Sequence, residues 1–111
     1  MKKTICIATD YTKKLGARDK TQGEYSGEDF RERFLIPFFN EKKNGDILEI
    51  NLDGLNGYPS SFFEEAFGGL ARFLKNIDLN EIKNSLRIIC TDVPLVESDI
   101  ASYIDEGRRR R

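Results

Sequence analysis

Apolar residues along this chain fall into two kinds of pattern. Short apolar runs of strand length alternate with longer segments in which apolar residues recur every three or four positions, the spacing of an amphipathic helix. The predicted strands span residues 3–8, 46–52 and 86–91, and the predicted helices begin at Ser26, at Ser60 or Ser61, and at Val96. This alternation predicts a small single-domain α/β fold with a central mixed β-sheet, at least partly parallel, and helices packed on it.

The first two helical segments are rich in phenylalanine. The apolar stripe of the first contains Phe30, Phe34 and Phe38, and that of the second contains Phe63, Phe67, Leu70 and Leu74. Gly45 follows the first helix and is predicted to be its C-cap. The run at 86–91 is almost continuously apolar, which is typical of a strand buried on both faces, so we predict it at the centre of the sheet.

Composition places the chain among globular proteins. Hydrophobic residues make up 39% and charged residues 33% of its 111 positions, a balance that suits one domain with a modest core. No apolar run approaches the roughly 20 residues of a membrane span, and the start of the chain is too polar for a signal peptide. We therefore expect a cytoplasmic protein with no membrane partner.

The charge balance depends on the last four residues. The net charge is −1, but without Arg108–Arg111 the chain has 14 basic against 19 acidic residues, a balance of −5. An acidic body argues against a nucleic-acid partner. The arginine run is compatible with a nucleic-acid or membrane tail, but a solvated terminus is favoured. We predict a domain over 1–107 and a basic tail over 108–111.

The absence of histidine removes many kinds of catalytic and metal site. It excludes a histidine base, a phosphohistidine and an ordinary zinc site. Cys6 and Cys90 lie in apolar runs and are expected to be buried free thiols. An enzyme would depend on residues such as Asp10, Asp92 and Glu65, yet the two aspartates follow strands, where turn roles are commoner than metal binding. We predict no catalytic residue, metal or cofactor.

Ser60 and Ser61 are the main candidate functional residues. They follow a strand and a tight loop at the start of a helix, where free backbone N–H groups favour negative charge. Ser61 and Glu64 have the spacing of a capping box, which leaves Ser60 as the freer hydroxyl. Two interpretations stay open: the serines only cap the helix, or one of them is a phosphoacceptor.

Gly68 and Gly69 interrupt the same helix at a cost of roughly 1 kcal/mol each relative to alanine. Close packing or a kink is the favoured explanation, and a smooth surface for a partner is the alternative. Elsewhere, Arg18 lies in a glycine-flanked loop and is a candidate anion-binding residue, although the chain has neither of the glycine-rich phosphate-binding motifs, GxxxxGK[ST] and GxGxxG.

The segments GARDKTQGEYSGEDFRERFLIPFF (16–39) and INLDGLNGYPSSFFEEAFGGLAR (50–72) resemble the bacterial STAS-like domains of unknown function. These are related in pattern to the STAS domains of anti-sigma-factor antagonists and sulphate transporters. In the antagonists, the equivalent strand–loop–helix carries an Asp-Ser-Ser/Thr-Gly motif, and a histidine-kinase-like ATPase phosphorylates its first hydroxyl residue. That residue corresponds to Ser60, with Pro59 in place of the Asp and Phe62 in place of the Gly.

The resemblance implies a non-enzymatic regulatory or adaptor module. STAS-like domains occur near or fused to histidine-kinase-like ATPases, so such a protein is the expected partner. We expect the partner to contact Tyr58, Ser60, Ser61, Phe62 and Glu65. The alternative is a sensor in which the helix N-terminus and Arg18 bind a nucleotide or another small anion. A homodimer that buries part of the phenylalanine stripes is a further hypothesis.

Overall fold

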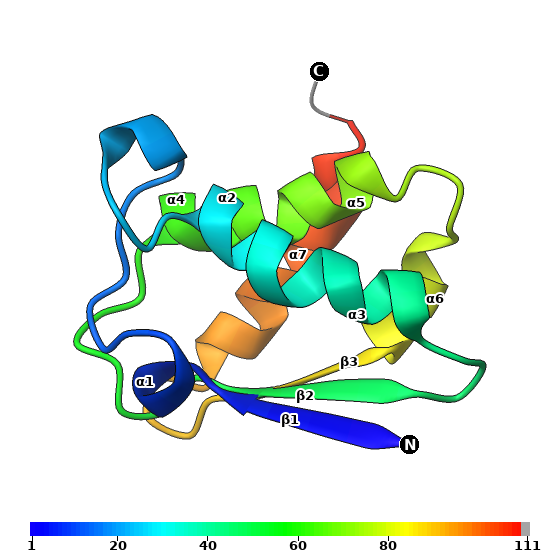
Figure 1. Cartoon of the computed structure of the whole chain (residues 1–111), viewed down its shortest axis with the longest axis horizontal. Helices are drawn as coiled ribbons and strands as arrows, with labels where there is room; N and C mark the ends of the chain where they lie inside the picture. The colour runs from blue at the N-terminus through cyan, green and yellow to red at the C-terminus, as the bar shows by residue number, and fades with distance from the viewer. Residues whose placement is uncertain (110–111) are drawn as a thin grey trace.

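The computed structural model describes residues 1–109 and confirms an α/β fold. Within this range the sheet has three strands: β1 (Lys2–Cys6), β2 (Ile47–Asn51) and β3 (Leu86–Ile89). They are parallel and lie in the order β1-β2-β3 (Figure 1). The expected mixed sheet is thus parallel throughout the described part, because each strand reaches the next through a helical crossover.

The prediction that the third strand is central was wrong. β2 is the middle strand, with Leu48 and Ile50 fully buried, whereas β3 forms an edge and its apolar side chains are only half-buried. Apolar continuity indicates a central strand when helices cover both faces of a sheet. In Figure 1 the long helices lie together on one side of the strands, so that premise fails here.

Two long helices cross above the sheet. The first runs through α2 (Gly27–Phe30), η2 (Arg31–Leu35) and α3 (Ile36–Glu41), and the second through α4 (Ser60–Phe63), η3 (Glu64–Gly68) and α5 (Gly69–Phe73). Both η2 and η3 are π-helical turns, which often occur at functional sites. The other segments are α1 (Ile7–Asp10), η1 (Lys20–Gln22), α6 (Leu79–Asn84) and α7 (Leu95–Gly107).

Sequence signals placed the first long helix well at its start and less well at its end. The Ser26 hydroxyl accepts a hydrogen bond from the Asp29 backbone N–H at 3.0 Å, as expected of an N-cap. The helix ends at Glu41, so Gly45 is not its C-cap but lies in the following turn with a φ of 91°. A positive φ favours glycine there, because other side chains rarely adopt it.

Phenylalanine dominates the core, as the stripes predicted. Phe30, Phe62, Phe63 and Phe67 are almost fully buried between the long helices and the sheet. The ring centroids of Phe30 and Phe62 lie 5.8 Å apart, and those of Phe63 and Phe67 lie 6.4 Å apart. Aromatic pairs at these separations contribute about 0.5–1.5 kcal/mol beyond area burial. These four rings are therefore used within the monomer, whereas Phe73 on α5 is 59% exposed.

The opposite face of the sheet carries charge. Glu49 on β2 pairs with Lys2 on β1 at 3.2 Å, and its Oε1 lies 3.9 Å from Arg87 Nε on β3. Cys6 is half-buried, Cys90 is buried, and both are free thiols. No helix within residues 1–109 is both long and apolar enough to cross a membrane.

Arg108 is part of the folded structure rather than of a basic tail. Its Nε donates a hydrogen bond to the carbonyl of Ala71 at 2.9 Å, and its Nη2 donates to the carbonyls of Leu74 and Ile77. These carbonyls belong to the end of α5 and the segment after it, where backbone oxygens have no helical partner. The domain thus extends at least to Arg108, and the rest of the predicted tail, apart from exposed Arg109, lies outside the described residues.

Candidate functional site

The second long helix begins at Ser60 without a side-chain cap. Its N-cap is Pro59, and within the described chain no side chain accepts a hydrogen bond at this cap. Ser60 is exposed and Ser61 is half-buried. The capping box predicted for Ser61 and Glu64 is therefore wrong, and both hydroxyls are released from that role.

Glu64 does not cap the helix because it is bound by arginines. It is only 6% exposed, and its two carboxylate oxygens pair separately with Arg18 and with Arg72. The Arg72 Nη1 to Glu64 Oε2 distance is 2.9 Å. A charge-assisted hydrogen bond of this kind is roughly twice as strong as a neutral one, so it outweighs the cap.

Glu65 completes what we call the arginine–glutamate cluster: Arg18, Arg31, Glu64, Glu65 and Arg72. Arg31 Nη1 donates to Glu65 Oε2 at 2.8 Å and to the Glu65 backbone oxygen at 2.5 Å. Glu65 Oε1 also lies 3.6 Å from Arg18 and 4.0 Å from Arg72. The hydrogen bond from Arg18 to Glu64 raises the pKa of the Arg18 guanidinium above its ordinary value. The cluster holds three positive and two negative side chains.

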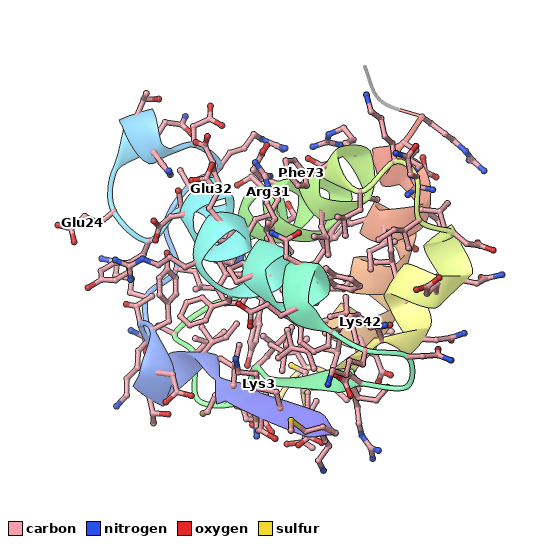
Figure 2. All side chains as sticks on the ribbon, turned by 45° about the vertical axis from the view of Figure 1, so that its right-hand side comes forward. Lys3, Glu24, Arg31, Glu32, Lys42 and Phe73 are labelled. Carbon is pink, nitrogen blue, oxygen red and sulfur yellow. The ribbon has the colours of Figure 1, made fainter. Side chains whose placement is uncertain are left out.

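Two glycines on the second long helix, Gly68 and Gly69, leave room for the side chains of the cluster. A Cβ on Gly68 would lie 2.6 Å from Glu64 Oε2 and 3.1 Å from the backbone oxygen of Tyr103 on α7. A Cβ on Gly69 would overlap the Arg31 guanidinium, which reaches across from the first long helix. Figure 2 labels Arg31 where the two long helices face each other. Close packing is thus the reason for the glycine pair, as favoured from the sequence.

Ser60 is adjacent to α7 through Tyr103. Burial raises the pKa of the Tyr103 phenol, the negative charges of Asp99 and Glu64 raise it further, and a hydrogen bond with Ser60 partly offsets them. The Ser60 hydroxyl therefore lies beside Tyr103 of α7. Leu95, the first residue of α7, is 73% exposed, and Val93 just before it is also exposed. Sequence patterns did not single out these two apolar residues.

The other predicted contact residues have mixed surroundings. Tyr58 is half-buried, and its hydroxyl donates to the Leu52 carbonyl at 3.2 Å. Burial, with the Cys90 thiol beside it, raises the pKa of Tyr58 to about 12. Phe62 is fully buried, so it cannot meet a partner and leaves the predicted contact set. Arg18 and Glu65 are both engaged in the cluster, so neither is an isolated binding group.

Sequence reasoning missed Arg31 and Arg72. The signal for Arg72 was present, because Glu64, Gly68 and Arg72 are spaced four apart on the second long helix, where such residues share a face. Arg31 had no comparable signal. Its partner lies 34 positions away, and only the crossing of the two helices brings the pair together.

Acidic residues that follow the strands accept hydrogen bonds from nearby backbone N–H groups. Asp10 accepts a hydrogen bond from the Cys6 N–H at 2.8 Å, and Asp92 accepts one from the Gly54 N–H at 3.1 Å. Asp53 accepts from the backbone N–H groups of Asp92 and Thr91 and from the Thr91 hydroxyl, which lowers the pKa of Asp53. In the described range, no group of three or more Cys, Asp or Glu side chains is placed to hold a metal.

These features define a small two-layer α/β domain with a polar cluster between its helices. The family model for the STAS-like domain of unknown function (DUF4325) matches residues 26–95, from the cap of the first long helix to the start of α7. The chain belongs to this family, as the resemblance indicated. The match contains Ser60 and every member of the arginine–glutamate cluster except Arg18. Searches of curated proteins and of solved structures gave no match.

Proposed function

We propose that this domain is a non-enzymatic regulatory module that binds a protein partner through the Ser60 end of the second long helix. Its membership of the STAS-like family supports a regulatory role. The observation that carries the proposal is the exposed Ser60 hydroxyl at the first position of a helix, where Pro59 rather than a side chain forms the cap. A serine that is neither buried nor used in capping is accessible to a partner or a kinase.

The proposed contact surface consists of Tyr58, Ser60, Ser61 and Glu65. An aromatic side chain beside hydroxyls provides the mixed polar and apolar character of protein interfaces. The expected partner is a histidine-kinase-like ATPase or a similar protein, by resemblance to the STAS proteins in which such an ATPase acts on the corresponding serine.

Phosphorylation of Ser60, or secondarily of Ser61, is the proposed switch. A phosphoserine carries roughly −1.5 to −2 charges at neutral pH. On Ser60 this charge would disturb the hydrogen bond with Tyr103, whose surroundings include the Asp99 carboxylate. The added charge and bulk would weaken the contact with a partner that packs on the bare hydroxyl, while the arginine–glutamate cluster holds the helix itself in place.

The test compares two substitutions of Ser60. We expect Ser60→Asp to raise the partner's dissociation constant by at least about tenfold, and Ser60→Ala to leave it nearly unchanged. Asn44→Asp is the matched control, because it adds the same charge in the exposed turn between α3 and β2, far from α4 in Figure 1. The partner is first isolated from the host with the Ser60→Ala protein as bait, and affinities are then measured by titration calorimetry.

Each outcome separates one part of the proposal from another. Equal affinity of Ser60→Asp and Ser60→Ala would reject the switch and keep the binding module. Failure to recover any specific partner under several growth conditions would reject the module. Mass spectrometry of the native protein adds an independent check. Phosphorylation adds one phosphate mass to the intact protein, and analysis of its peptides shows whether the phosphate lies on the peptide that contains Ser60 and Ser61.

A small-anion or nucleotide sensor is the second candidate. The excess of one positive charge in the arginine–glutamate cluster supports it, as does the partial exposure of Arg18. A thermal-shift screen with inorganic phosphate and nucleotides tests this function. An anion that raises the melting temperature of the wild type but not of Arg18→Ala would favour the sensor.

A further inference from the structure

The free edge of β3 is the strongest unexplained surface in the described chain. Leu48 N–H donates to the Ser85 carbonyl and Leu52 N–H to the Ile89 carbonyl, both at 2.8 Å. Backbone groups along a strand alternate in direction, so the odd-numbered positions of β3 face β2. The backbone groups of Leu86, Ile88 and Cys90 therefore point away from the sheet, toward the edge.

The two edges of the sheet differ in how they are protected. β1 begins with exposed Lys2 and Lys3, and lysine on an edge strand discourages pairing with another chain. β3 has the apolar residues Leu86, Ile88 and Ile89, each half-buried. A single arginine, Arg87, is the only charge on this strand. The β3 edge is therefore the one whose residues favour pairing with a strand of another chain.

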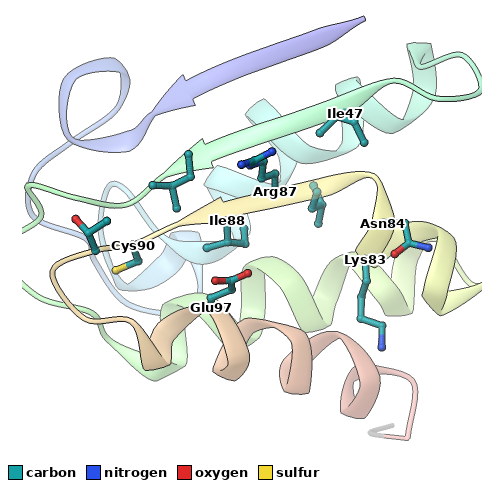
Figure 3. A pocket seen from close by; sticks show the side chains of 10 residues that line it. Ile47, Lys83, Asn84, Arg87, Ile88, Cys90 and Glu97 are labelled. Atoms are coloured by element: carbon teal, nitrogen blue, oxygen red, sulfur yellow. The ribbon is translucent and has the colours of Figure 1, made fainter.

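A groove runs along this edge and gives a second strand room to approach. It has a volume of about 650 Å³ and extends from Lys83 past Ile88 to Glu97. Figure 3 shows it between β3 and the start of α7. A smaller hollow of about 170 Å³ lies beside it and is lined by the apolar residues Ile100 and Ile104 of α7. The helix thus leaves the outer side of β3 uncovered.

We propose that β3 pairs with β3 of a second copy of this chain, antiparallel and with Ile88 opposite Ile88, so that two sheets join into one. In this register the outward backbone groups of Ile88 bond to each other across the two-fold axis, and those of Leu86 bond to those of Cys90. The same pairing places apolar side chains together on the helix-covered face. Both copies then contribute the same surface patch to the interface, which is the commonest arrangement of a dimer.

The charges around β3 favour a second copy in antiparallel orientation. Lys83 lies before the strand and Asp92 after it, so antiparallel pairing brings these unlike charges near each other, in addition to the pair that Lys83 makes with Asp105 at 2.8 Å. With Ile88 on the axis, Arg87 lies opposite Ile89. Moving the axis to Arg87 would place two arginines directly opposite each other, which destabilises a strand pair.

Sedimentation equilibrium of the wild type over a hundredfold concentration range is the first measurement. Edge pairing buries a small area, so we expect a weak dimer that dissociates on dilution. A protein that stays monomeric at the highest concentrations overturns the proposal.

Three variants then test the surface and the register. Ile89→Lys places a lysine opposite Arg87 of the second copy twice, by symmetry, and is expected to raise the dimer dissociation constant roughly tenfold. Adding Arg87→Glu to Ile89→Lys converts both repulsive pairs into attractive ones and should restore dimerisation. Thr4→Lys on β1 is the control, because it adds the same residue to the other edge of the sheet and should leave the dimer intact.

Circular dichroism confirms that each variant is folded before its mass is compared. A dimer that survives Ile89→Lys would assign the interface elsewhere and overturn the proposal. Loss of the dimer without rescue by the added Arg87→Glu would overturn the register with Ile88 on the axis. If Ile89→Lys does not fold, Ile88→Pro takes its place: it removes an N–H that points out of the sheet, so the dimer should be lost while the three-stranded sheet is kept, and a dimer that survives would overturn the proposal.

Discussion

Ser60 and Glu64 lie one turn apart on the same helix, yet they have opposite surroundings. Ser60 is exposed at the helix start with no cap to form, whereas Glu64 is buried and held by two arginines. The sequence suggested that this first turn was one local unit, with Ser61 and Glu64 closing a capping box. In the structure, this turn has two parts: an anchored part, Glu64 with its arginines, and an accessible part, Ser60.

The difference shows how tertiary charge pairing overrides local capping. A capping box contributes about 1 kcal/mol. A carboxylate that is nearly buried must find a full charge partner, because an unpaired buried charge costs far more than a lost cap. Once Arg18 and Arg72 supply that charge, the Glu64 carboxylate is used in ion pairs, and the serines beside it do not form the predicted capping box.

The largest expected effect comes from breaking the anchored part. Glu64→Gln leaves the arginines around it without their main counter-charge, and we expect the free energy of unfolding to fall by roughly 3 kcal/mol. Urea denaturation measures the loss. Glu32→Gln is the control, because Glu32 also pairs with a cation, Lys20, but both side chains are well exposed and such pairs contribute less than about 1 kcal/mol. Equal losses in the two variants would contradict a special role for the cluster.

A smaller effect is expected where glycine makes room for the same anchor. Gly68→Ala would push a methyl group against the Glu64 carboxylate and the Tyr103 carbonyl, and we expect a loss of about 1–2 kcal/mol despite alanine's better helix propensity. Gly57→Ala is its control, since no atom lies within 4 Å of the added group there. A thermal melt that ranks Gly57→Ala as the more damaging change would refute this explanation of the glycine pair.

The smallest effect distinguishes the accessible part from a true cap. Ser26→Ala removes a hydroxyl that accepts a hydrogen bond in the first long helix and should cost about 1 kcal/mol. Ser60→Ala removes one that caps nothing and whose hydrogen bond with Tyr103 is made by an exposed residue, so it should change stability by no more than a few tenths of a kcal/mol. Chemical denaturation of the two variants side by side provides the comparison. A cost for Ser60→Ala as large as that for Ser26→Ala would mean that its hydroxyl is structural.

Sequence periodicity predicted the elements well where one face of a helix is buried. The phenylalanine stripes located both long helices and most of the core, because apolar spacing reports directly on which side chains are covered. The same logic misplaced β3, since an apolar run cannot show whether helices cover one face of a sheet or two. The short helix α1 also went unrecognised, and residues 7–8 were assigned to the first strand.

The candidate site was predictable only in part. Ser60, Ser61 and Glu65 were identified from local order along one helix, and Arg18 was noted as an isolated cation. What the sequence could not supply was the packing of the first long helix, and of the loop that carries Arg18, against the second long helix. This packing makes Arg31 and Arg18 partners of residues more than thirty positions away. Long-range ion pairs have no periodic signature, so they appear only once the fold is known.

The hydrogen bonds of Arg108 have a consequence for how two helices move. Because one guanidinium binds the carbonyls of Ala71, Leu74 and Ile77, it joins the end of α7 to the end of α5. A displacement of α7 would therefore be transmitted to the second long helix, which begins at Ser60. We expect the two helices to move as one rigid unit rather than independently.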